Sequence, residues 1–311
     1  MSLPSMVRAL RNNKILKVFV SFWLPFAAAA ALWVALGHGE EFDLNKTLAA
    51  AEKGDAEAEF MLGRAYDSGK GVAADAKKAL EYYRRAAEQG NAKAQNNLAS
   101  LYALGAGGVA QDKVEAKKWL RKAASQGAAL PEDNLGIMLA QEGDKEAVEW
   151  LAKAAEQGLL SAQLHLGDLY YNGGPAVTQD YSQAAKWLQK AADQGNARAQ
   201  NVLGVMYQNG RGVKRDLAEA VKWFQRGAEQ QNAKAESNLG QMYCVGSGVK
   251  ADAAEGYKWL TLSAEQNEVT AIKFLVDFKS GMTLDQIAAG QKLVEEYKEH
   301  QHSDAPKPSK S

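Results

Sequence analysis

The sequence predicts an all-α fold, a right-handed solenoid of stacked antiparallel helix pairs that is preceded by an N-terminal signal peptide or membrane-anchor helix. Three observations carry this prediction. A pattern of about 36 residues recurs along most of the chain, and a leucine–glycine pair and a later tryptophan return at fixed places in it. An uncharged apolar run lies near the N-terminus. Repeats of this length cannot bury an apolar face alone, so they stack on their neighbours into an array.

The N-terminal segment predicts export. Residues 18–36 carry no charge. The charged residues before them are all basic (Arg8, Arg11, Lys14 and Lys17). A basic flank before an apolar run is typical of a secretory signal, and these 19 residues approach the roughly 20 needed to span a bilayer. Residues 1–37 are therefore either a cleaved signal peptide or a retained signal anchor. Both alternatives place the chain from about residue 38 outside the cytosol.

Six segments then align in register. In each, a leucine followed by glycine or a near equivalent lies four residues before a tyrosine or leucine, which puts these side chains on one helical face. Later in each segment a large aromatic residue follows a small residue by three positions, which suits close helix packing. Each segment is expected to form two antiparallel helices. The segments are residues 55–90, 91–127, 128–158, 159–195, 196–231 and 232–267, and their large aromatic residues are Tyr82, Trp119, Trp150, Trp187, Trp223 and Trp259.

A glycine-rich turn separates the two helices of a repeat, as in Gly210-Arg211-Gly212-Val213. Three residues after the valine comes an aspartate that can cap the second helix by accepting a backbone N–H. A phosphate-binding loop is not favoured, because no Walker-type lysine follows the glycines and no strand precedes them. The expected caps are Asp75, Asp112, Asp180, Asp216 and Asp252.

The third repeat departs from the pattern. Its turn shrinks to residues 141–144, and Pro131 takes the place of an alanine in a first helical turn, where proline is tolerated. The shorter turn is either a harmless deletion or a local change of superhelix curvature.

The two ends of the array are also irregular. Residues 43–54 correspond to the second helix of a truncated leading repeat, so the solenoid is expected over residues 43–299. The closing unit, residues 268–299, has Val276 where the other repeats have glycine or alanine, and it ends in an amphipathic capping helix. The polar tail, residues 300–311, is expected to be disordered.

The whole pattern resembles the Sel-one-like repeat (SLR), a relative of the tetratricopeptide repeat with a longer turn. The shared pattern runs Ala, Leu-Gly, Tyr, Gly-x-Gly-Val, Asp, Ala-x-x-Trp, Ala-Ala-x-x-Gly, and it covers residues 55–267 nearly without interruption. The resemblance implies a non-enzymatic scaffold or regulatory adaptor of the bacterial cell envelope that binds a protein or peptide partner. Combined with the N-terminal segment, it implies a location in the periplasm, or in the inner membrane facing the periplasm.

The alternative is an enzyme that binds or hydrolyses penicillin or acts on the cell wall, as linked to a cysteine-rich branch of the family. That branch carries paired cysteines in its repeats, and this chain has only Cys244. The chain also lacks Gly-x-Ser-x-Gly and His-Glu-x-x-His motifs, and none of its four histidines forms a helical metal-ligand pair. We therefore expect no catalytic residue, no cofactor and no metal site.

Charge disfavours a nucleic-acid partner, and none is expected, because Lys+Arg 37 against Asp+Glu 37 leaves no overall positive field to hold a polyanion. A single cysteine likewise excludes an intrachain disulfide or a cysteine-based zinc site. His165 occupies a position that is asparagine in other repeats, so it is expected to make a polar contact between repeats. The sequence does not predict an oligomeric state.

The candidate site is the concave face. In the related tetratricopeptide geometry the first helices line this face, so their polar residues that are not used for packing should meet a partner. Amide and guanidinium groups suit the backbone of an extended peptide. The stretch from Arg198 to Gln241 is the best candidate, because two adjacent repeats supply it. The expected contacts are Arg64, Asn96, Ser100, Asp168, Tyr171, Arg198, Asn201, Gln208, Asn209, Lys234, Ser237 and Gln241.

Overall fold

The computed structural model describes residues 43–303, which form fifteen α-helices and no strand. The predicted signal or anchor, residues 1–37, lies outside this range. None of the described helices is both long and apolar enough to cross a membrane. The expectation of a disordered tail is wrong for residues 300–303, which continue the last helix. Gln301 there is held by Gln231, whose Nε2 donates to its Oε1 at 3.2 Å.

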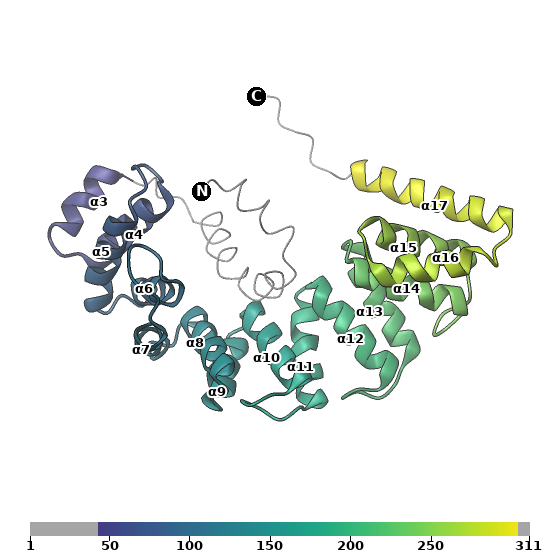
Figure 1. The fold of residues 1–311 in the computed structure, drawn as a ribbon, viewed down its shortest axis with the longest axis horizontal. Coiled ribbons are helices and arrows are strands. Elements are labelled where there is room, and N and C mark those ends of the chain that lie inside the picture. Colours follow the sequence, from purple (N-terminus) through teal and green to yellow (C-terminus); the bar gives the residue numbers. More distant parts are fainter. Residues whose placement is uncertain (1–42, 304–311) are drawn as a thin grey trace.

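The helices run in sequence as one solenoid (Figure 1). A single helix, α3 (Leu44–Ala51), leads six antiparallel pairs. Two helices of the closing unit follow, α16 (Val269–Lys279) and α17 (Leu284–Ser303). The six pairs are α4 (Ala56–Ser68) with α5 (Ala76–Glu88), α6 (Ala92–Leu104) with α7 (Lys113–Ala124), α8 (Ala129–Glu142) with α9 (Glu146–Glu156), α10 (Leu160–Asn172) with α11 (Tyr181–Asp193), α12 (Ala197–Asn209) with α13 (Leu217–Glu229), and α14 (Ala233–Val245) with α15 (Ala253–Glu265).

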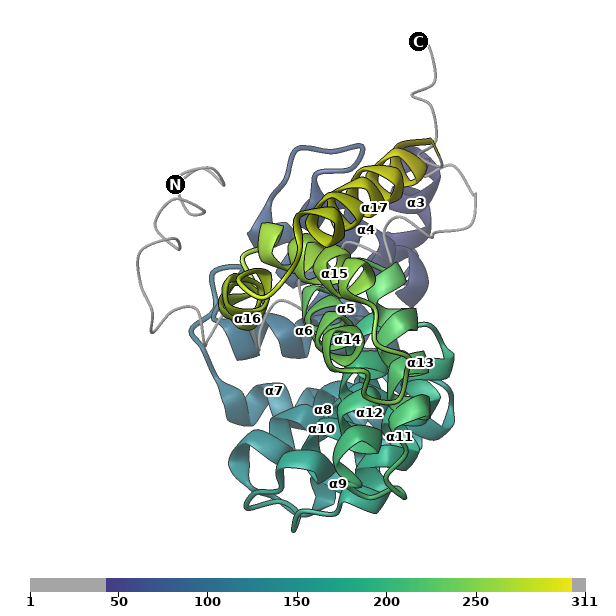
Figure 2. The same cartoon turned by 90° about the vertical axis from the view of Figure 1, so that its right-hand side faces the viewer.

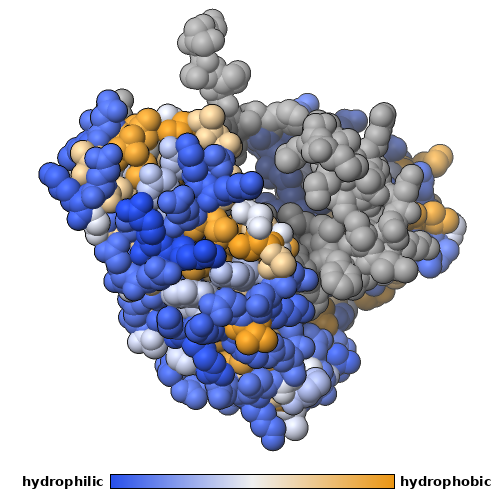
Figure 3. All heavy atoms as spheres, turned by 60° about the vertical axis from the view of Figure 1, so that its left-hand side comes forward, coloured by the Kyte–Doolittle hydropathy of each residue, from blue (hydrophilic) through white to orange (hydrophobic). Residues whose placement is uncertain are grey.

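The pairs stack into an open arc that twists along its length (Figures 1 and 2). One face of the arc is mostly hydrophilic, with hydrophobic residues in separate patches (Figure 3). The predicted all-α solenoid is therefore confirmed.

Aspartate caps begin the second helices as the sequence predicts. Asp75, Asp112, Asp180, Asp216 and Asp252 all accept from backbone N–H groups of the first helical turn. In the shortened third repeat, Asp144 accepts from the N–H of Glu146 at 3.0 Å. Each contact satisfies a backbone donor that the helix itself leaves unpaired.

Within a repeat, the glycine of the leucine–glycine pair lets the two helices approach. In repeat five, a Cβ added to Gly204 would lie 2.6 Å from the ring of Phe224. The same relation, at 2.5–2.8 Å, holds for Gly63 with Tyr83, Gly136 with Leu151, Gly167 with Leu188 and Gly240 with Leu260. The residue that fills this space is thus the one after the predicted aromatic residue.

The tryptophans instead join neighbouring repeats. Trp187, for example, clusters with Leu151 of repeat three and Leu166 of repeat four. Trp119, Trp187, Trp223 and Trp259 are buried, whereas Tyr82 and Trp150 are only half-buried.

The glycine-rich turns also connect repeats. Gly212 has a left-handed backbone (φ 71°), and an added Cβ would overlap the carbonyl of Tyr181, the first residue of the preceding second helix. Gly248 of repeat six meets Leu217, the first residue of the second helix of repeat five, in the same way. Each of these turns therefore rests directly on the repeat before it.

A ladder of hydrogen bonds between exposed glutamines and buried glutamines or glutamates, which the sequence analysis missed, runs through all six repeats. A glutamine just after each second helix donates its Nε2 to a glutamate or glutamine of the first helix at 2.6–2.9 Å. The pairs are Gln89–Glu59, Gln126–Gln95, Gln157–Glu132, Gln194–Gln163, Gln230–Gln200 and Gln266–Glu236. Both residues of each pair recur at the repeat spacing in the sequence, so this regularity could have indicated the ladder.

Where the first-helix residue is glutamine, its own amide donates backward to the preceding second helix. Gln200 Nε2, for example, donates to the carbonyl of Ala192 at 3.1 Å. A glutamate cannot do this when ionised. Glu59 is instead paired with Arg85, which donates to the corresponding carbonyl of Ala51.

Glu236 has no such cation. It is 1% exposed, and burial raises its pKa from 4.5 to about 7, although the bond from Gln266 opposes the shift. The proton-bearing form is thus stabilised at the junction of repeats five and six.

The closing unit departs from the repeat geometry. Val276 of α16 replaces the glycine that would admit a second helix, and α17 packs on α15 instead. Gly290 of α17 lies against the Tyr257 ring. Tyr297 meets Trp259 edge-on, with ring centroids 5.3 Å apart. Figure 2 shows α17 lying over α15.

Candidate functional site

The first helices line the inner face of the arc. Neighbouring first helices contact each other directly, as α6 does with α8, α8 with α10, α12 with α14 and α14 with α16. The side of a curved array on which neighbours come closest is its concave side. In Figure 1, α4, α8 and α10 lie towards the inside of the arc and α5, α7 and α9 towards the outside.

The structure places the twelve expected contact residues in three groups. Arg198, Asn209 and Lys234 are exposed. Arg64, Ser100, Asp168, Tyr171, Gln208 and Gln241 are half-buried. Asn96, Asn201 and Ser237 are buried.

The three buried residues correct the expectation of twelve accessible groups. Asn96 Oδ1 accepts from Asn134 Nδ2 of the next repeat at 2.7 Å, and Asn201 accepts from Asn238 at 2.8 Å. Ser237 Oγ accepts from Gln241 at 3.2 Å. The polar atoms of these side chains therefore hold the inner face together, because buried polar groups need partners.

His165 makes the polar contact between repeats that the sequence predicts. Its Nδ1 lies 2.9 Å from Asp133 Oδ1, in the position that the asparagine pairs occupy elsewhere. Ser161 Oγ donates to the other oxygen of Asp133 at 2.7 Å. Both oxygens of this buried carboxyl thus have partners from the fourth repeat.

Charged groups remain accessible on the inner face of repeats four to six. Arg198 Nη2 of repeat five bonds Asp168 Oδ2 of repeat four at 2.7 Å. Lys234, one repeat further, is exposed and forms no ion pair with any described residue. Beside them, the side-chain amide of Gln208 makes a long contact to the Met242 sulfur at 3.5 Å.

Apolar side chains lie among these polar ones, and the sequence analysis missed them. Val202 and Val205 are half-buried on α12, as are Ile137 on α8 and Leu164 on α10. Leu130 of α8 is 38% exposed. Val205, Ile137, Leu164 and Leu130 occupy the same repeat positions as expected polar contacts, and they were missed because only polar residues were selected. The inner face is therefore mixed in polarity.

The described residues offer little for catalysis. No group of three or more histidine, cysteine, aspartate or glutamate side chains among them could hold a metal ion. Burial raises the pKa of the Cys244 thiol to about 12, which disfavours the nucleophilic thiolate at neutral pH.

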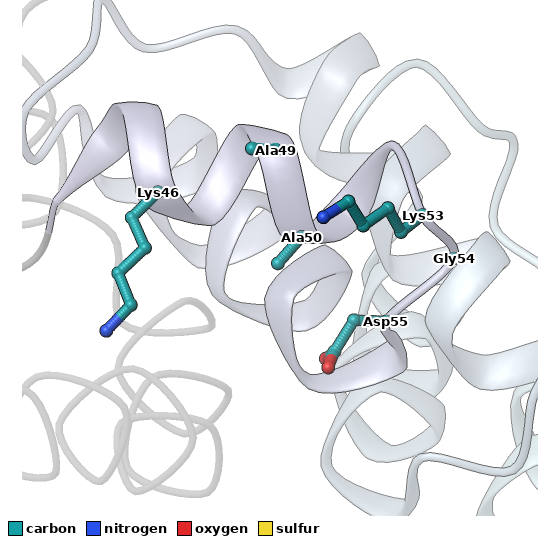
Figure 4. A pocket seen from close by; sticks show the side chains of 6 residues that line it. All are labelled: Lys46, Ala49, Ala50, Lys53, Gly54 and Asp55. Atoms are coloured by element: carbon teal, nitrogen blue, oxygen red, sulfur yellow. The ribbon is translucent and has the colours of Figure 1, made fainter.

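A shallow hollow of about 520 Å³ lies at the first turn after α3. Figure 4 shows its three charged groups spread around the rim rather than converging on one point. A small-molecule site needs an enclosed space with convergent polar groups, and this hollow lacks both features. Its lining residues are Lys46, Ala49, Ala50, Lys53, Gly54 and Asp55.

Comparison with protein families gives a match over most of the array. The Sel1 repeat matches residues 56–91, 92–127, 135–159, 160–196, 197–232 and 233–268. The third match is the short one, in keeping with the shortened turn of that repeat.

Two solved structures are similar over much of the chain. A Sel1 repeat protein from Oxalobacter formigenes is 35% identical with a TM-score of 0.60, over 77% of this chain and 70% of that one. A protective antigen of uropathogenic Escherichia coli with an SLR fold, c5321, is 26% identical with a TM-score of 0.50, over 85% of this chain and 67% of that one. No curated protein matches the chain.

Proposed function

The chain belongs to the Sel1 repeat family, and we propose that it is a non-enzymatic scaffold or regulatory adaptor that binds a protein partner on the inner face of repeats four to six. Proteins built from Sel1 repeats typically mediate protein–protein interactions. One observation supports the proposal most directly. In these repeats the inner face combines the Arg198–Asp168 pair, the unpaired Lys234 and the apolar Val202 and Val205 on one side of the arc.

This combination suits a peptide segment better than a small molecule. The first helices form an open surface, and the amide of Gln208 is half-exposed on it. Amide groups can bond a peptide backbone, and the two valines offer contact to apolar side chains. A partner chain lying along α10, α12 and α14 would meet all of these groups.

We also propose that the array works outside the cytosol, in the periplasm or anchored at the inner membrane. Support comes from the uncharged residues 18–36 with their basic flank. The chain from residue 38 onward has 33 basic and 37 acidic residues, because residues 1–37 hold four of the 37 basic residues and none of the 37 acidic ones.

Site-specific photocrosslinking in the native cell tests the binding face. A photoreactive amino acid at Asn209, exposed on the inner face, should crosslink to a partner protein. The same group at Gln225, exposed on the outward helix α13, should not. Equal crosslinking at both positions would argue against an inner-face site. Crosslinks to cytosolic proteins alone would overturn the proposed location.

A surface variant gives the quantitative test. Replacing Arg198, Lys234 and Gln241 with alanine should weaken binding of the crosslinked partner by roughly 10- to 100-fold, because charged and amide hydrogen bonds are lost. The matched control replaces Lys186, Lys222 and Gln225 with alanine. It removes the same number of positive charges and amide groups, but from the outer helices. The control should bind as wild type, and circular dichroism should show the wild-type helical content for both variants.

A further inference from the structure

Two arginines in the turn of repeat five have no carboxylate partner, whereas three other arginines of the array do. Arg85, Arg121 and Arg198 each form an ion pair with a carboxylate, with N–O distances of 2.5–2.8 Å. Arg211 and Arg215 have no ion pair with any described residue. Arg211 Nη1 instead donates to the Tyr171 hydroxyl at 3.0 Å, and Arg215 Nε donates to the Gln208 carbonyl at 3.1 Å. Neutral oxygens thus hold both side chains, and their charges are not neutralised.

The turn that carries these arginines is held in place. Gly212, between them, has a left-handed backbone and rests on the carbonyl of Tyr181. The Arg211 guanidinium lies over the Tyr181 ring, 5.5 Å from its centre, and that ring meets Tyr171 edge-on at 5.2 Å. Side chains fixed in this way lose little freedom on binding an anion.

Hydrogen-bond donors remain on both guanidinium groups. Arg211 uses Nη1, which leaves the Nε–Nη2 edge, and Arg215 uses Nε, which leaves its two terminal nitrogens. Each free edge matches the spacing of the two oxygens of a carboxylate. Tyr171 and Tyr181 raise the pKa of Arg211, and no carboxylate is among the groups that act on it.

Two more cations lie close by. Lys214 is in the same turn, and Lys250 follows Gly248, which packs against Leu217 just beyond Arg215. Both lysines are exposed, and neither forms an ion pair with a described residue. The nearby Asp216 and Asp252 are engaged as helix caps.

We propose that the turn of repeat five is an anion-binding edge of the inner face, where Arg211 and Arg215 take the carboxylates of an acidic segment in the protein partner. The inference rests on the proposed function, because Tyr171 and Gln208, which anchor the arginines, belong to the face assigned to the partner. An acidic peptide fits better than a nucleic acid or a membrane surface, since the net negative charge of the chain from residue 38 disfavours a large polyanion, while four cations gather at this turn.

Binding of fluorescein-labelled hexaglutamate, measured by anisotropy on the full chain, tests the proposal. Wild type should bind it with an affinity that falls as salt rises, and should not bind labelled hexaglutamine. The Arg211→Gln/Arg215→Gln double variant should lose roughly 10- to 100-fold in affinity. The Arg84→Gln/Arg226→Gln variant changes two exposed arginines of the outer helices and should bind as wild type.

The Tyr171→Phe variant tests whether binding depends on the fixed position of Arg211 or only on its charge. It keeps every charge and removes only the hydroxyl that anchors Arg211, so a loss of about 3- to 10-fold is expected from the lost preorganisation. Unchanged affinity in this variant would contradict the role assigned to Tyr171. Inorganic phosphate and phosphatidylglycerol vesicles serve as competitors, and neither should displace the peptide at equal charge concentration.

Two outcomes overturn the proposal, namely no hexaglutamate binding by wild type, or equal losses in the two arginine double variants. Failure here is distinguishable from failure of the proposed function. A partner that crosslinks at Asn209 while hexaglutamate does not bind would retain the inner-face site and reject its acidic ligand.

Discussion

Gly204 lies directly against the ring of Phe224, where a Cβ would come within 2.6 Å of the ring carbons. Phe224 is fully buried, so its ring has little room to move. The glycine therefore decides how closely α12 and α13 pack.

Gly204→Ala should lower the free energy of unfolding by about 1–3 kcal/mol, because overpacking a filled core forces side chains and backbone to shift. Repeat two suggests the compensating change. There Ala99 stands in the glycine position and the facing residue is Leu120. The double variant Gly204→Ala/Phe224→Leu should recover part of the loss in urea denaturation. A loss in the double variant equal to the sum of the two single losses would mean that the two positions do not pack as a pair.

Gly212→Ala should be more damaging than a glycine substitution in an open turn. The added Cβ would overlap the Tyr181 carbonyl. In addition, an alanine in the left-handed backbone conformation costs about 1–2 kcal/mol on its own. Gly195→Ala is the control, since Gly195 is also left-handed (φ 87°) but has nothing within 4 Å of an added Cβ. Thermal melts of the two variants should differ by several degrees, and identical midpoints would rule out the contact between turn and helix.

Trp223→Ala should cost about 3–5 kcal/mol, as expected for removing a large buried aromatic side chain. Trp223 is 4% exposed and clusters with Leu203 and Met206. Trp150, at the same repeat position, is only half-buried, so Trp150→Ala should cost distinctly less. The comparison needs only chemical denaturation of both variants. A larger loss at Trp150 would show that burial does not rank these sites.

Glu236 should make stability depend on pH. Its carboxyl has a pKa of about 7 in the folded protein against 4.5 ordinarily, so the folded state holds more protons between these values. Stability from this group is therefore fully present below about pH 4.5 and is lost as pH rises to about 7, by on the order of 1–3 kcal/mol.

Glu236→Gln removes that titration and restores the residue type found at Gln95, Gln163 and Gln200. The variant should be more stable than wild type at pH 8 and nearly equal to it at pH 4.5. Melting temperatures of both proteins across this range give the difference curve. A flat difference would show that Glu236 does not titrate in this window.

Local features of the array could be predicted from the sequence, because each depends on neighbours in the chain. The aspartate caps and the pairing of helices within a repeat belong to this group. Burial of Asn96 and Asn201 could not be predicted, since it depends on how far one first helix slides along the next. The pattern of residue types at Glu59, Gln95 and their counterparts was visible, but only the structure gives the partners of these side chains. The inner face was also expected to be more polar than it is, because only polar residues were selected and apolar residues at the same repeat positions, such as Val205, were passed over.

Val276 also limits where a further repeat can be added to the array. A new repeat added after α16 would place its second helix against a valine side chain instead of a glycine, and α17 already covers Trp259. A unit of one repeat inserted between residues 231 and 232 would meet the ordinary surfaces on both sides. Lengthening by gene duplication, or by protein engineering, is therefore expected to succeed inside the array and to fail at its C-terminal end.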